Sequence, residues 1–205
     1  MDDALRHLMR VIAAGDEATA LGLLADAPAL AKGALSADAT RAAAAENFLT
    51  AITRHVYAGD TALHVAAAAH RPETVRALLA LGADVAARNR RGATALHYAA
   101  DGNPAGSRWN PAAQAATIAL LTASGADPNA GDKSGVAPLH RAVRGRCAAA
   151  VAALLDGGAD AARPNGNGST PMLLATRQTG RGGSGSDEAK AQQAEVIALL
   201  EAQGG

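Results

Sequence analysis

Three of the six histidines in this chain of 205 residues stand in the same local sequence. His64, His97 and His140 each follow a leucine, in the segments Thr-Ala-Leu-His, Thr-Ala-Leu-His and Ala-Pro-Leu-His. They lie 33 and 43 residues apart, whereas metal ligands on one element are separated by only a few residues. We therefore expect each ring to form a structural hydrogen bond with the backbone of a neighbouring unit.

Nucleophilic chemistry has a single cysteine to draw on, Cys147, near the start of an expected helix. No histidine stands at catalytic spacing from it, so an inert thiol is favoured over a reactive one. The sequence also offers no nucleophile–base pair, no cluster of metal ligands and no pair of catalytic carboxylates. We therefore expect no enzymatic activity and no cofactor.

Two segments rich in turn-forming residues could bind a ligand. Residues 101–111 contain the only tryptophan, within the pair Arg108-Trp109, and both residue types are frequent in binding hot spots. The alternative is that Trp109 fastens its own loop to adjacent helices. The glycine-rich residues 179–186 precede an expected helix and could hold a phosphate with backbone amides. They lack the lysine and hydroxyl residue that end a P-loop, so a flexible surface loop is favoured.

The elements that must position these residues are expected to be helices. The chain is 49% hydrophobic but only 2% aromatic, and alanine supplies more than half of its hydrophobic residues. Aromatic and β-branched residues favour strands, whereas alanine is the best helix former. The composition therefore disfavours a β-sandwich or a barrel and indicates helices that approach closely through small side chains.

Two phrases recur in step along the chain. Thr61-Ala-Leu-His returns 33 residues later at Thr94, and related segments begin at Ala137 and Thr170. A second phrase, Leu-Leu-Ala-Leu-Gly-Ala-Asp at residues 78–84, is echoed at 120–127 and 154–160. Repetition at a fixed period of 33 residues indicates that one supersecondary unit has been copied.

These phrases resemble the ankyrin-repeat family, whose repeat reads T-P-L-H-x-A and continues into a helix that ends in L-L-x-x-G-A-D. The resemblance implies an all-α solenoid of stacked helix-turn-helix units joined by hairpin-like fingers. Threonines would cap the first helices, prolines would open helices and glycines would end them. The residues expected in these three roles are Thr61, Thr94 and Thr170, then Pro72, Pro111, Pro138 and Pro171, then Gly82, Gly125 and Gly158.

The expected organisation is a single domain over residues 1–205. Its parts are an N-terminal cap at 4–36, an inserted helix at 37–58, repeats at 59–91, 92–134 and 135–167, and a C-terminal cap with the glycine-rich insertion at 168–205. The first insertion predicts an amphipathic helix over residues 39–53, because Ala42, Ala45, Leu49 and Ile52 would share one face. This helix would pack on the solenoid or, alternatively, bind a partner.

The second and third insertions occupy the same slot between the two helices of their units and lie two repeats apart. The first helix of the unit between them carries Arg141 and Arg144, three residues apart and therefore on one face. The equivalent positions hold Tyr98 and Asp101 one unit earlier and Leu174 and Arg177 one unit later. With fingertip arginines added, the inner face is expected to be locally basic although the formal net charge is zero.

The resemblance implies a non-enzymatic module that binds another protein through its fingers and first helices, and the basic face suggests that the partner offers acidic groups. The alternative is a small-molecule or anion-binding pocket, which could be enzymatic, formed by the two inter-helix loops. The residues predicted to bind are Arg88, Arg90, Arg91, Tyr98, Asp101, Arg108, Trp109, Lys133, Arg141, Arg144, Arg177 and Arg181.

Other partners and locations are disfavoured. The 19 basic and 19 acidic residues cancel, and aromatic residues are scarce, so neither a basic stripe nor stacking platforms point to nucleic acid. No apolar run approaches the roughly 18 residues of a membrane helix, and no signal peptide is recognised at the acidic start of the chain. We expect a cytoplasmic protein, with the monomer as the favoured state.

Overall fold

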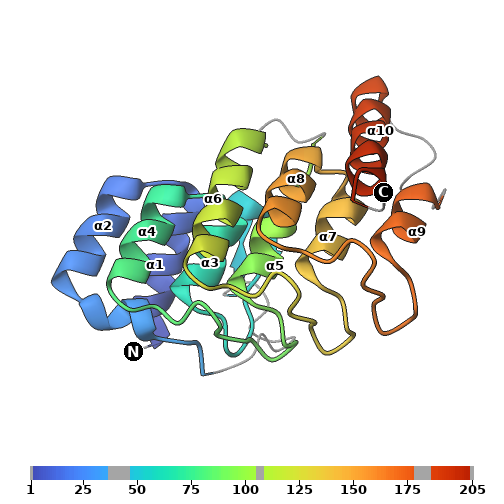
Figure 1. The fold of residues 1–205 in the computed structure, drawn as a ribbon. Helices are drawn as coiled ribbons and strands as arrows, with labels where there is room; N and C mark the ends of the chain where they lie inside the picture. Colours follow the sequence, from blue (N-terminus) through green and yellow to red (C-terminus); the bar gives the residue numbers. More distant parts are fainter. Residues whose placement is uncertain (1, 37–46, 105–108, 178–185, 204–205) are drawn as a thin grey trace.

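The computed structural model describes residues 2–36, 47–104, 109–177 and 186–203. In this part of the chain ten α-helices stand side by side in a row that runs from the N-terminus to the C-terminus (Figure 1). They form five consecutive pairs: α1 Asp2–Ala14 with α2 Glu17–Asp26, α3 Ala62–Ala68 with α4 Pro72–Ala80, α5 Ala95–Ala100 with α6 Pro111–Ala123, α7 Pro138–Gly145 with α8 Ala148–Asp156, and α9 Pro171–Thr176 with α10 Asp187–Glu201.

The pairs stack as two layers of helices. The first helices contact one another in the order α1, α3, α5, α7 and α9, and the second helices contact one another in the order α2, α4, α6, α8 and α10. The connections from α4 to α5, from α6 to α7 and from α8 to α9 project as fingers beyond the ends of the first helices, along one side of the row (Figure 1). This arrangement confirms the predicted all-α solenoid of stacked helix-turn-helix units joined by fingers.

The predicted helix caps are in place. The Thr61 hydroxyl accepts a hydrogen bond from the His64 backbone N–H at 3.4 Å, while Nδ1 of His64 accepts one from the Thr61 N–H at 3.2 Å. The Thr94 N–H likewise donates to Nδ1 of His97, whereas at α9 the Thr170 hydroxyl accepts from the Leu173 N–H without a histidine partner. Four helices begin at proline as expected. These contacts satisfy N–H groups that the first turn of a helix leaves unpaired.

The repeated histidines tie each unit to the next, as predicted. Nε2 of His64, His97 and His140 lies 3.1, 2.9 and 3.1 Å from the carbonyl oxygens of Ala93, Val136 and Ser169. In His97, Nδ1 accepts from the Thr94 N–H, so the ring hydrogen is carried by Nε2 and donated to the next finger. The three rings are therefore held in the neutral form.

Alanine allows the first helices to approach closely. Ala66, Ala67, Ala99 and Ala100 are completely buried among the leucines of neighbouring first helices. Because alanine loses no side-chain entropy and adds little bulk, each helix can press its backbone against the next. The low aromatic content is thus a property of the packing.

The inserted helix predicted over residues 39–53 is wrong for its described part. Residues 48–55 form a two-stranded antiparallel sheet, β1 Phe48–Leu49 and β2 Arg54–His55, joined by the 3-10 turn η2 Thr50–Ile52. Thr50 and Ile52 are β-branched, which lowers their helix propensity, and the turn ends at Thr53, whose φ of +49° is incompatible with a continuing α-helix. Leu49 is buried, so the apolar spacing is satisfied by a hairpin. Residues 39–46 lie outside the described ranges.

Stacking energy can be tested at Leu154 on α8, which is completely buried. We expect Leu154→Ala to lower the free energy of unfolding by about 2–5 kcal/mol, because it removes buried methyl groups and leaves a cavity. Leu21→Ala on α2 is the matched control, since that side chain is 39% exposed and its loss should cost about 0.5 kcal/mol. Urea unfolding followed by circular dichroism measures both values, and equal losses would contradict the stacking account.

The buried histidines predict acid sensitivity. Burial, together with the nearby Arg141, lowers the pKa of His97 to about 4 from an ordinary value of 6.5. The unfolded chain therefore binds more protons than the folded chain between these values, and stability is lost as the pH falls through this window. The shift corresponds to on the order of 3 kcal/mol.

We expect the free energy of unfolding to fall between pH 6.5 and pH 4, and His97→Gln to flatten part of that slope. His7→Gln, at an exposed position of α1, is the control and should leave the slope unchanged. Urea titrations at several pH values provide the measurement, and an unaltered slope in His97→Gln would refute the assignment.

Candidate functional site

The fingers are joined by backbone hydrogen bonds. The Lys133 N–H donates to the Arg91 carbonyl at 3.0 Å, and the Arg90 N–H donates to Ala58 O at 2.8 Å. Gly92 has a φ of +75°, and a Cβ there would come 3.0 Å from Lys133 N, so adjacent fingers meet backbone to backbone. The exposed side chains of Arg90, Arg91 and Lys133 are therefore held in a row.

A buried polar cluster of Asp60, Asn89 and Tyr98 lies next to this row of basic side chains. The Tyr98 hydroxyl donates to Asp60 Oδ2 at 3.1 Å and accepts from Asn89 Nδ2 at 2.9 Å. Burial and the Asp60 carboxylate raise the pKa of Tyr98 above its ordinary range. The Arg54 guanidinium lies 4.6 Å from the centroid of the Tyr98 ring. Tyr98 is only 3% exposed, so the structure places it as a support for Arg54 rather than as a contact surface.

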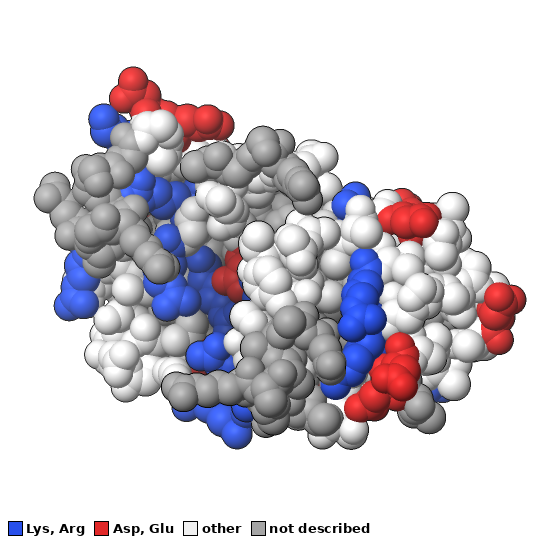
Figure 2. Space-filling model, turned by 180° about the vertical axis from the view of Figure 1, so that it is seen from behind, with Lys and Arg blue, Asp and Glu red and all other residues white. Residues whose placement is uncertain are grey.

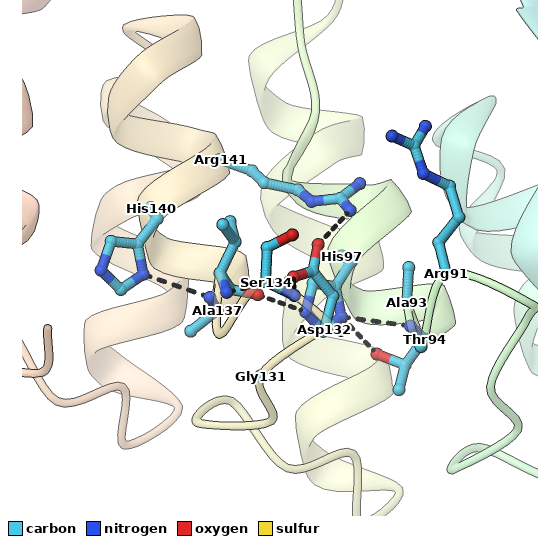
Figure 3. A network of polar contacts seen from close by, with 12 residues as sticks. Arg91, Ala93, Thr94, His97, Gly131, Asp132, Ser134, Ala137, His140 and Arg141 are labelled. Carbon is cyan, nitrogen blue, oxygen red and sulfur yellow. Dashed lines mark hydrogen bonds and ion pairs between the residues drawn. The ribbon is translucent and has the colours of Figure 1, made fainter. Parts of the chain in front are cut away.

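A chain of ion pairs crosses the first helices. Arg54 Nη2 lies 2.9 Å from Asp101 Oδ2, and Arg141 Nη1 lies 3.2 Å from the same oxygen. Arg141 Nη2 also lies 3.1 Å from Asp132 Oδ2 (Figure 3). Burial opposes ionisation of Asp132, but hydrogen bonds from Ser134, Val136 and Arg141 outweigh it and lower the pKa of that carboxyl. Both Asp101 and Asp132 are therefore already paired with arginines of this chain.

Two hollows open on either side of this ion-pair chain and share Asp101, Arg141 and Arg144. The finger hollow, of about 530 Å³, adds a ring of mainly basic residues: Arg54, Arg90, Arg91, Asp132 and Lys133. The helix-end pocket, of about 470 Å³, lies where α7 and α9 end beside α10 and adds Arg146, Leu174, Arg177 and Val196. Figure 2 shows Lys and Arg side chains gathered around a hollowed part of this face, with a small acidic patch inside it.

The structure brings together most of the predicted binding residues, since Arg90, Arg91, Asp101, Lys133, Arg141, Arg144 and Arg177 line these two hollows. Arg88 has a different place, because its Nη1 donates to Gly92 O and Gly131 O, both at 2.8 Å, and joins two fingers. Arg108 and Arg181 lie outside the described residues.

Trp109 is partly buried and fastens its loop. Its indole N–H donates to Gln114 Oε1 at 2.7 Å, and Gln114 in turn donates to Ala99 O at 2.9 Å. The ring also packs against the hydrophobic core. These contacts support the alternative that Trp109 anchors the start of α6.

Sequence reasoning missed Arg54, Asp132 and Arg146. Asp132 had a usable signal, because it occupies the finger position held by Asn89 and Asn165 in other units. Each of these side chains accepts backbone N–H groups of its own finger. An acid in a slot otherwise filled by asparagine indicates an added charge partner, which proves to be Arg141.

The described residues offer little for covalent or metal chemistry. Cys147 is completely buried beside the inner face, and burial raises the pKa of its thiol to about 12. Within the described ranges, no three His, Cys, Asp or Glu side chains cluster as a metal site would require. The finger hollow and the helix-end pocket instead provide positive charge around a cavity.

The ion-pair chain predicts a stability effect at Asp101. Asp101→Asn would leave Arg54 and Arg141 without their shared carboxylate, and we expect a loss of about 1–2 kcal/mol because the three groups are mostly buried. Asp187→Asn removes the exposed pair with Lys190 and should cost under about 0.5 kcal/mol. Urea unfolding compares the two variants, and equal losses of stability would show that the chain of ion pairs contributes no more than the exposed pair does.

Comparison with known families identifies the repeats. Residues 8–108 match a family described as ankyrin repeats in three copies, and residues 91–133 match the single ankyrin repeat. A search of curated proteins found no match. No described helix is both long enough and apolar enough to cross a membrane. Ankyrin repeats generally act as protein–protein interaction modules and are typically non-enzymatic. The repeated phrases, the stacked helix pairs and these matches together establish that the chain belongs to the ankyrin-repeat family.

Proposed function

We propose that this protein is a non-enzymatic interaction module that binds an acidic segment of a partner protein in the finger hollow. One observation carries the proposal. Of the described residues that line this hollow, six are basic and only two, Asp101 and Asp132, are acidic, although the formal net charge of the chain is zero. The positive charge is therefore concentrated on one face.

The two acids do not neutralise this charge completely. Asp101 and Asp132 are paired with Arg54 and Arg141, which are partly buried. Arg91, Lys133 and Arg144 are exposed, and within the described ranges none of the three forms an ion pair. Carboxylates of a partner would supply what these cations lack, with charge-assisted hydrogen bonds at the arginines.

The shape of the hollow favours an extended partner segment that crosses the fingers. Arg91 and Lys133 come from neighbouring fingers whose backbones are hydrogen-bonded, so their spacing is fixed before binding. Arg91, on the finger before α5, and Arg141, on α7, extend toward the same region (Figure 3). A binding surface that is already ordered loses little entropy on association.

The charge-reversal variant Arg91→Glu/Lys133→Glu tests the proposal. The protein and its variants are used to capture partners from a lysate of the source cell. We expect the amount of partner protein captured by the double variant to fall at least tenfold, because carboxylates would then face carboxylates. For wild type, raising the salt from roughly 50 mM to 0.5 M should weaken capture, since exposed charges are screened.

The matched control is Arg76→Glu/Arg163→Glu, which makes the same charge change at exposed residues that line neither hollow. This control should capture as wild type does. Equal capture by Arg91→Glu/Lys133→Glu and by wild type would overturn the proposal. Arg141 is unsuitable for reversal because a third carboxylate beside Asp101 and Asp132 would disturb the fold.

A further inference from the structure

We infer that the helix-end pocket is a second binding site, for a small phosphorylated molecule, which adjoins the finger hollow proposed to hold a protein partner and shares Arg144 with it. The pocket has a volume of about 470 Å³ and lies where α7 and α9 end, against α10. Ligand pockets in proteins commonly measure roughly 300–1,000 Å³, so it has room for a compound of sugar to nucleotide size.

The excess of positive charge in the pocket favours an anionic ligand. Four arginines line it, and Asp101 is the one acidic residue among its described lining. That carboxylate already accepts from Arg54 and Arg141. Arg144 and Arg177 are exposed and form no ion pair within the described part of the chain. Like charges that converge on one hollow repel each other until an anion lies between them.

The rest of the lining suits a ligand with an uncharged body. Val143, Leu174, Ala175 and Val196 also line the pocket and form its apolar wall. A guanidinium presents two parallel N–H donors that match the oxygens of a phosphate, and several guanidinium groups favour an anion with more than one charge. The geometry thus fits a phosphorylated metabolite, with its phosphates at Arg144 and Arg177 and its body against the apolar wall.

A structural role for the same arginines must be separated from a binding role. Arg144 and Arg177 stand at the ends of α7 and α9, where cations interact favourably with the helix dipole. That role predicts lower stability after substitution. It predicts no gain of thermal stability from added phosphate compounds and no heat of binding.

The experiment titrates the full chain with pyrophosphate as the minimal probe and with adenosine diphosphate as the probe that carries a body. Isothermal titration calorimetry measures the affinity, and the melting temperature is followed at matched ionic strength in sodium chloride. We expect wild type to bind both probes at one site and to melt at a higher temperature than in chloride alone. Arg144→Gln/Arg177→Gln should weaken both affinities at least tenfold.

Arg76→Gln/Arg163→Gln is the matched control and should bind both probes as wild type does. Arg177→Gln alone, at a residue that lines the helix-end pocket but not the finger hollow, should weaken binding without unfolding the chain, as checked by circular dichroism. Equal probe binding by wild type and Arg144→Gln/Arg177→Gln overturns the inference, as does a chloride effect as large as that of pyrophosphate. Binding of an acidic phosphoserine peptide in place of both probes also overturns it.

The two proposals fail separately. Arg91→Glu/Lys133→Glu should still bind pyrophosphate, because neither residue lines the helix-end pocket. Loss of partner capture in that variant with pyrophosphate binding retained supports both sites. Pyrophosphate binding that depends on Arg91 and Lys133 but not on Arg177 would show that only the finger hollow attracts anions.

Discussion

The hydrogen bond from a buried histidine to the next finger is the constraint on which the structure depends. Each unit contributes two short helices, too few to bury an apolar face alone, so stability must come from the contact between units. Each repeated histidine contributes to this contact through both of its ring nitrogens. Nδ1 of His97 accepts from the N–H at the start of its own helix, while Nε2 donates to Val136 O of the next finger. One side chain therefore sets both the start of a helix and the distance to its neighbour.

The same constraint places the charges. Because each finger is fixed to the preceding first helix, its tip meets the adjacent tip with a defined offset, and Arg91 and Lys133 fall into one row. The ring must be neutral to serve in this way, and burial keeps the pKa of His97 far below neutrality. The basic face and the acid-sensitive core are thus consequences of one interaction rather than separate features.

The sequence predicted what the repeat controls and failed where the repeat is interrupted. The Thr61-to-His64 phrase specified the cap, the helix and the inter-unit bond, because its residues act locally or on the adjacent copy. The stretch around Leu49 and Ile52 has no second copy, and its apolar spacing fits a helix and a hairpin equally well. Ion pairs are also beyond a one-dimensional reading, since Arg54 and Asp101 lie 47 residues apart and meet only after stacking.

The insertions show why a rigid repeat can acquire a local site. The bond from His64 to the next finger spans 29 residues, and that from His97 spans 39, yet the two distances differ by only 0.2 Å. The extra residues are therefore inserted between α5 and α6 without altering the contact between units. The entropic cost of closing a longer loop rises only slowly with its length. The inserted residues follow the ends of the first helices, where the helix-end pocket also opens. A solenoid held together by repeated local bonds can thus vary its chemistry at one edge while the opposite edge, with its fingers, keeps a fixed geometry.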